Sequence, residues 1–76
     1  MTKLVEAIAK SLVDKPENVV VTETSGRQGT VIELKVDPDD MGKVIGKQGR
    51  IAKAIRSVVK AAAAKEDKKV VVEIAG

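Results

Sequence analysis

Apolar residues recur along this chain with two different periods, and the periods divide it into helices and strands. From Thr2 to Asp14 the apolar positions are spaced by one, three and four residues, which predicts an amphipathic helix capped by Thr2. This helix should end near Asp14, because Pro16 disfavours helical geometry in the residue before it. Its apolar face consists of Leu4, Val5, Ile8, Ala9, Leu12 and Val13.

A period of two replaces the helical period after Pro16. Residues 19–24 are rich in β-branched side chains, which favour a strand, and residues 30–36 alternate between two faces. Residues 25–29 form a polar segment with two glycines, which predicts a turn and hence an antiparallel hairpin. In the second strand, one face carries Ile32, Leu34 and Val36, and the other carries Val31, Glu33 and Lys35.

The second half of the chain opens with the helix-start sequence Asp37-Pro38-Asp39-Asp40. Asp37 can cap a helix, Pro38 suits the first helical position, and the next two acids favour the positive end of the helix dipole. The helix should be short, since Gly46 interrupts it. A longer helix is expected from Arg50 to Ala64, with Ile51, Ile55, Val58, Val59 and Ala62 inward and Lys53, Arg56 and Lys60 outward. Val70, Val72 and Ile74 alternate in a last strand.

The predicted element order is therefore α-β-β-α-α-β. A crossover through two helices normally returns the next strand parallel to the previous one in the same sheet. We expect an α+β fold, a two-layer sandwich with a three-stranded mixed sheet and three helices on one face. Residues 1–76 contain no repeat or linker and are expected to form a single domain.

The composition excludes several classes of function. The 76 residues include no cysteine, histidine or aromatic side chain, so disulfides, thiolate zinc sites, imidazole bases and base stacking on aromatic rings are all excluded. The carboxylates fall at strand faces, helix surfaces and helix starts, so we expect no enzyme, metal site or cofactor. The uncharged runs are too short to cross a membrane, and a cytoplasmic protein is expected.

Charge is distributed unevenly along the chain. The net charge is +3, but residues 41–65 carry seven basic side chains and no acidic one, whereas residues 1–40 carry five basic and eight acidic ones. A field concentrated in this way steers a polyanion toward one region. A solvated basic helix face would give the same pattern, so charge alone does not decide between the two interpretations.

The centre of the basic region is the sequence Gly46-Lys47-Gln48-Gly49, between the last two helices. Glycines three apart permit a tight turn and close approach of another molecule to the backbone, and the free N-H groups of the next helix begin near Arg50. The spacing fits neither a Walker A loop nor a Rossmann fingerprint. A helix-hairpin-helix module usually has an apolar residue between its glycines, which is absent here. The remaining alternative is a tight helix connection without further function.

At this point the residues resemble a known family. Ile45-Gly46-Lys47-Gln48-Gly49-Arg50-Ile51, at a helix-turn-helix junction within the order α-β-β-α-α-β, looks like the signature of the type II K-homology (KH) domain. The resemblance covers essentially the whole chain and is greatest to the small bacterial single-domain KH proteins of the KhpA family. It implies binding of single-stranded RNA or DNA, with about four nucleotides held against the turn.

Carried over to this sequence, the resemblance implies roles for particular residues. Gly46 and Gly49 would allow close approach, Lys47 would pair with a phosphate, and Gln48 would hydrogen-bond to sugar or phosphate. Further phosphate contacts are expected from the flanking helices, at Arg50, Lys43 and Lys53. The bases would lie in an aliphatic groove that could include Val44, Ile45 and residues of the second strand. Ile45 and Ile51 are expected first of all as core residues that fix the pair of helices.

The resemblance also implies a biological setting: an RNA chaperone or post-transcriptional regulator. Because one KH domain contacts few nucleotides, a homodimer or a complex with a larger KH-containing RNA-binding protein is expected. The alternative is a protein-interaction or dimerisation module with incidental nucleic-acid binding. Exposed apolar side chains on the outer face of the sheet, at Val20, Val31 and Val71, would favour that alternative.

Overall fold

Helices and strands account for most of residues 1–27 and 29–75, which the computed structural model describes. They follow the predicted order α-β-β-α-α-β. Their bounds are α1 (Thr2–Leu12), β1 (Val20–Gly26), β2 (Gly29–Lys35), α2 (Met41–Ile45), α3 (Arg50–Lys65) and β3 (Val70–Ala75). Short 3-10 turns precede β1, α2 and α3, at Pro16–Asn18, Pro38–Asp40 and Lys47–Gly49.

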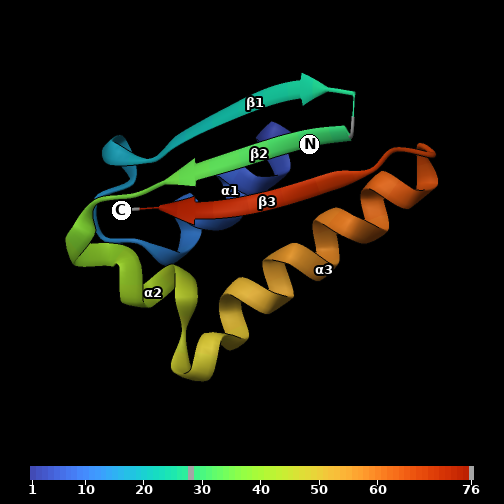
Figure 1. Ribbon diagram of the computed structural model, residues 1–76. Helices are drawn as coiled ribbons and strands as arrows, with labels where there is room; N and C mark the ends of the chain where they lie inside the picture. Colours follow the sequence, from blue (N-terminus) through green and yellow to red (C-terminus); the bar gives the residue numbers. More distant parts are fainter. Residues whose placement is uncertain (28, 76) are drawn as a thin grey trace.

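The three strands form one mixed sheet in the order β1-β2-β3 (Figure 1). β1 and β2 are antiparallel, with Val21 opposite Leu34, and β2 and β3 are parallel, with Ile32 opposite Val72. The helices cover one face of this sheet, and the other face is open (Figure 1). The α+β two-layer fold with a mixed sheet and three helices on one face is thereby confirmed.

The core lies between the sheet and the helices. It is built from the inward side chains of β2 and β3 and the apolar faces of the helices, because side chains alternate across a strand and recur every three or four residues on a helix. Burying side chains of this kind is the main source of stability for so short a chain. The residues buried in this cluster are Val5, Ala9, Ile32, Leu34, Val36, Val44, Ile55, Val59 and Val72.

The hairpin is tied to the start of β3 by a glycine. Gly29 has a φ of +120°, and a Cβ at this position would lie 2.6 Å from the carbonyl oxygen of Lys69. The next residue, Thr30, donates its backbone N-H to the same oxygen at 2.9 Å. The close approach that glycine permits therefore brings the hairpin and the first residues of β3 together at one end of the sheet.

Some expected details are wrong at the ends and on the faces of the helices. Met1 occupies the N-cap position of α1, with Thr2 inside the helix. The helix ends at Leu12 with Val13 as its C-cap, close to the expected end near Asp14. Asp37 does cap the turn at Pro38, since its Oδ1 accepts the backbone N-H of Asp39 at 2.9 Å.

Two apolar side chains that the helical spacing placed inward are exposed. Val58 on α3 is 46% exposed, and Leu4 on α1 is 37% exposed. In α3 the buried residues are Ala52, Ile55, Val59 and Ala63, a row with a spacing of three and four residues that leaves Val58 at its border. In α1 and α3, therefore, fewer apolar side chains contact the core than the spacing of apolar residues in the sequence predicts.

Candidate nucleic-acid interface

The turn between α2 and α3 reverses the chain within four residues. α2 ends at Ile45, and the backbone N-H of Gly46 donates to the carbonyl of Gly42 at 2.9 Å. Gly46 then leaves the helix with φ 76° and ψ 175°, a conformation almost confined to glycine. The backbone N-H of Gly49 donates to the carbonyl of Gly46 at 3.1 Å and closes the turn.

The two glycines serve different purposes. A Cβ at Gly46 would lie 2.6 to 2.9 Å from side-chain atoms of Ile51, so the missing side chain lets the first turn of α3 pack against the end of α2. Gly49 has φ 73° and ψ 15°, and a Cβ there would meet no atom within 4 Å. Gly46 is thus required for packing and conformation, whereas Gly49 is required for conformation and leaves open space beside it.

The tip of the turn is exposed, and its side chains have no polar partner among the described residues. Lys47 and Gln48 are exposed, and Gln48 has a positive φ of 58°, which turns the chain toward α3. Across residues 1–27 and 29–75, no ion pair or side-chain hydrogen bond involves Lys47, Gln48, Arg50 or Lys53. These four polar groups are therefore available to a ligand.

The N-terminus of α3 adds a positive potential to the same place. Gly49 is its N-cap, no side chain caps the helix, and its first turn contains no acidic residue. The backbone N-H of Arg50 itself donates to the carbonyl of Lys47 in the turn. The N-terminus of a helix nevertheless carries partial positive charge, so an anion beside the first turn of α3 is favoured. The turn and the first residues of α3 together form a site suited to a phosphate group.

A row of basic side chains continues from the turn along α3. Lys53, Arg56 and Lys60 are exposed and spaced by three and four residues, so they follow one flank of the helix. Arg56 and Lys60 line a groove of about 460 Å³ between α3 and β3, whose apolar wall includes Ala63 and Val70. The Nε of Arg56 donates to the carbonyl of Val72 at 3.4 Å, which holds the guanidinium at the edge of β3.

Arg56 and Lys60 were predicted on the outer face of a helix but not in the site. Their spacing from Lys53 was the available signal. What the sequence did not reveal is that β3 forms the edge of the sheet beside α3, so that this flank of the helix borders a groove.

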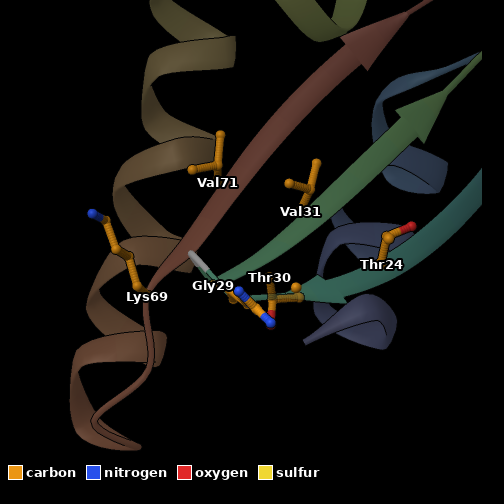
Figure 2. A pocket seen from close by; sticks show the side chains of 8 residues that line it. Thr24, Gly29, Thr30, Val31, Lys69 and Val71 are labelled. Carbon is orange, nitrogen blue, oxygen red and sulfur yellow. The ribbon is translucent and has the colours of Figure 1, made fainter.

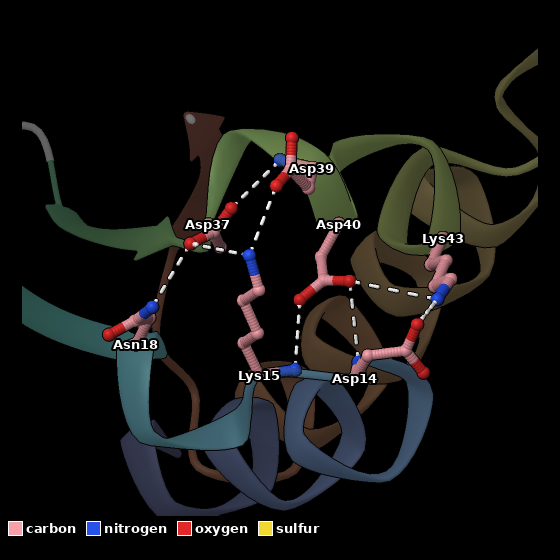
Figure 3. Close-up of polar contacts among 7 residues, drawn as sticks. All are labelled: Asp14, Lys15, Asn18, Asp37, Asp39, Asp40 and Lys43. Carbon is pink, nitrogen blue, oxygen red and sulfur yellow. Dashed lines mark hydrogen bonds and ion pairs between the residues drawn. The ribbon is translucent and has the colours of Figure 1, made fainter.

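Lys43 lies near the turn but is engaged within the protein (Figure 3). Its ammonium pairs with Asp14 and lies 3.7 Å from Oδ1 of Asp40. The hydrogen bond to Asp14, with the charges of Asp14 and Asp40, raises the pKa of Lys43 above its usual value. A phosphate contact by Lys43 would therefore have to replace these pairings.

A second ion-pair group lies beside the first (Figure 3). Nζ of Lys15 is 3.0 Å from Asp39 and 3.8 Å from Asp37, and these carboxylates raise the pKa of Lys15, the hydrogen bond to Asp39 most of all. The backbone N-H of Asp39 lowers the pKa of Asp37. The acidic residues before α2 thus interact with the segment after α1 and leave the turn free of negative partners.

The expected aliphatic groove requires a correction. Val44 is fully buried, so its side chain supports the turn from the core and offers no surface to a base. Ile45 and Ile51 are half-buried and pack against the same core, as expected of residues that fix the pair of helices. The second strand is the central strand, and its inward residues Ile32 and Leu34 are fully buried, so the groove is formed by β3 instead.

The described part of the chain holds no group of three or more acidic, histidine or cysteine residues arranged to bind a metal ion. Within residues 1–27 and 29–75, every helix is too short or too polar to cross a bilayer.

The element order, the mixed sheet and the basic Gly-x-x-Gly turn define the class of this chain as a type II KH domain. A family model described as "KhpA/KhpB, KH domain" matches residues 2–74. The chain therefore belongs to the KhpA/KhpB family of KH domains.

Curated relatives of nearly equal length support this assignment. The chain is 74% identical to the RNA-binding protein KhpA of Clostridium perfringens over 97% of its own length and 99% of the relative. It is 66% identical to the protein of that name from Caldanaerobacter subterraneus, with the same coverage of both chains. For the Aquifex aeolicus protein the identity is 55%, over 93% of this chain and 90% of the relative. These relatives carry the names of RNA-binding proteins rather than enzymes.

Solved structures of Era share the fold. One, of Era in complex with MgGDPNP and nucleotides 1506–1542 of 16S ribosomal RNA, aligns with a TM-score of 0.58 and 23% identity over 96% of this chain. Another, of Aquifex aeolicus Era, aligns with a TM-score of 0.57 and 22% identity. This chain spans 28% of the length of each Era chain, so the likeness concerns one part of a larger protein and shows the fold alone.

Proposed function

We propose that this chain is a single-stranded RNA-binding module that grips the sugar-phosphate backbone with the turn Gly46-Lys47-Gln48-Gly49. The observation that carries the proposal is the exposed turn, whose cation and amide lack partners among the described residues, next to the uncapped N-terminus of α3. Lys47 pairs with one phosphate, and Gln48 donates to a sugar or phosphate oxygen. Arg50 and Lys53 extend the contact to the adjacent phosphates.

The bases of the bound strand enter the groove between α3 and β3. Since the chain has no aromatic residue, they contact aliphatic side chains such as Ala63 and Val70, and Arg56 and Lys60 hold the phosphates above them. Contacts of this kind discriminate poorly between bases, which suits an RNA chaperone or a post-transcriptional regulator with many targets. Single-stranded DNA presents the same phosphates and is the competing ligand.

The test of the grip is RNA binding by a double variant, Lys47→Asp with Gln48→Asp. We expect the affinity for a short labelled oligouridylate, measured by fluorescence anisotropy, to fall at least roughly tenfold, because the variant replaces a charge-assisted attraction by a repulsion. A plot of log affinity against log salt concentration has a negative slope. This slope should become shallower by about 0.7 for each phosphate that the variant no longer neutralises. Circular dichroism checks that the variant is folded.

The matched control is Lys3→Asp with Ala7→Asp, which makes the same change of net charge on the exposed surface of α1. It should retain most of the affinity. Equal losses of affinity in the two double variants would mean that binding depends on overall charge, and full affinity in the turn variant would refute the proposed grip.

We further propose that the module works as a homodimer or in a complex with a larger KH-containing RNA-binding protein. Val58 supports this, since a valine that is 46% exposed on α3 is a candidate for a protein contact. It stands two residues after Arg56, on the other flank of the helix from the RNA groove. A dimer formed through Val58 would leave both grooves free, and two linked grips would add avidity.

Val58→Glu should weaken self-association about tenfold, as measured by sedimentation equilibrium, because an ionised carboxylate would be buried in the interface. Val20→Glu, on the open sheet face, is the matched control, since Val20 is 50% exposed. A larger effect of Val20→Glu would assign the contact to the sheet. A wild-type chain that stays monomeric at every concentration would leave only the complex with another protein.

A further inference from the structure

The open face of the sheet carries a shallow hollow at its hairpin end (Figure 2). The hollow has a volume of about 1260 Å³ and contains no carboxylate among its lining residues. Its floor is a cross-strand row of Thr24, Val31 and Val71, and Arg27 and Lys69 supply two positive charges. Figure 2 shows Val31 and Val71 on neighbouring strands of this face, with Lys69 at the edge of the sheet beside α3.

The next row along the strands has the opposite character. Thr22, Glu33 and Glu73 lie side by side there, about 7 Å further along the sheet. Val20 belongs to the row after that one, opposite Lys35. The exposed valines of this face are thus separated by an acidic row and do not form one apolar patch. The carboxylates of Glu33 and Glu73 disfavour a polyanion in the middle of the face, whereas Arg27 and Lys69 place positive charge at the hairpin end.

The hollow borders the groove between α3 and β3. Both are lined by Lys69 and Val71, at the start of β3. In Figure 1, α3 runs from the Gly-x-x-Gly turn toward the hairpin end of the sheet. Arg50 and Lys60 are separated along α3 by about 15 Å, so the basic surface extends well beyond the turn. Glu66 and Asp67, in the connection between α3 and β3, line neither the groove nor the hollow.

From this juxtaposition we propose that the hollow is a second contact surface for the same single-stranded RNA, reached by the strand after it leaves the groove. Arg27 and Lys69 hold its phosphates, a base lies on the aliphatic surface of Val31 and Val71, and the hydroxyl of Thr24 is a hydrogen-bonding partner. The inference rests on the proposed function, and it enlarges the binding site beyond the roughly four nucleotides that the turn holds.

The test compares the affinities of Arg27→Glu for two oligouridylates, of about four and about twelve nucleotides. The variant should bind the longer RNA about fivefold more weakly than the wild-type protein, and the shorter RNA within about twofold. The longer RNA offers more overlapping binding positions, which raises its apparent affinity for both proteins. Dividing the affinity of the variant by that of the wild-type protein for the same RNA removes this effect. Lys35→Glu is the matched control, since it makes the same charge change on the same face beyond the acidic row. It should affect both RNAs equally and slightly.

Three results would overturn the inference: equal weakening of both RNAs by Arg27→Glu, no weakening of either, or a changed oligomeric state with unchanged RNA affinity. The last would assign the hollow to a protein contact. The Lys47→Asp, Gln48→Asp variant in the same assay separates this inference from the proposed function. If the Lys47→Asp, Gln48→Asp variant binds the shorter RNA more weakly, the proposed grip by the turn is supported, whatever the result for Arg27→Glu. If that variant binds the shorter RNA as the wild-type protein does, the proposed grip is refuted.

Discussion

Gly46→Ala is expected to lower the free energy of unfolding by about 2–4 kcal/mol, more than an alanine at any other position of the turn. Two costs add. The backbone at φ 76° and ψ 175° is strained for any residue with a Cβ, and that Cβ would lie 2.6 Å from Cγ1 of Ile51. Relief requires α3 to move away from α2, which displaces Lys47 and Gln48 from the positions that the proposed grip needs. Urea unfolding followed by circular dichroism measures the decrease.

The other glycines of this region provide graded controls. Gly49→Ala meets no atom within 4 Å and keeps only the left-handed backbone cost, so about 1 kcal/mol is expected. Gly42→Ala, inside α2 with open space around its Cβ, should be neutral or stabilising by up to about 1 kcal/mol. If Gly46→Ala lowers the free energy of unfolding no more than Gly49→Ala does, the contact between Gly46 and Ile51 does not fix α2 against α3.

Local patterns were sufficient for most of the fold. The alternation of Ile32 and Leu34 with Val31 and Glu33 fixed which face of the central strand is buried, because a shift by one residue exchanges the faces. The parallel return of β3 followed from its connection through two helices. The turn at Gly46 was predictable because glycine is the residue that such a backbone requires.

What the sequence could not give depends on contacts between distant segments. Lys43 was expected to face a phosphate, but its partner Asp14 is 29 residues away and no local pattern connects them. Val58 and Val44 are both valines on helices, yet Val58 is exposed and Val44 is fully buried. Which apolar residues of a helix are buried depends on the elements that pack against it. The α3–β3 groove likewise required the strand order, which places β3 at the edge.

Asp40→Ala is expected to destabilise the protein by about 2–4 kcal/mol. Asp39 and Asp40 were both expected to favour the start of the helix, but Asp40 has a different role. Its carboxylate is 2% exposed and accepts the backbone N-H groups of Asp14, at 3.3 Å, and Lys15, at 3.0 Å. Removing it leaves both donors without their acceptor and removes one partner of Lys43. Urea unfolding by circular dichroism again gives the change.

Asp39→Ala is the matched control, because the neighbouring carboxylate has a side chain that is 79% exposed and a surface ion pair with Lys15. It should cost less than about 1 kcal/mol. Asp40→Asn should fall between the two, since its amide oxygen still accepts one N-H group. Equal costs for Asp39→Ala and Asp40→Ala would show that the buried carboxylate is not a structural link.

The position of Asp40 gives this link a functional consequence. Asp40 immediately precedes α2, and α2 leads within five residues to Gly46. The carboxylate therefore fastens the helix that carries the turn to the segment after α1. If that attachment positions the grip, folded Asp40→Asn should bind short RNA more weakly than folded Asp39→Ala and than the wild-type protein. Each variant removes one negative charge near the turn, so simple electrostatics predicts that both bind at least as tightly as the wild-type protein, and weaker binding by Asp40→Asn alone separates positioning from charge.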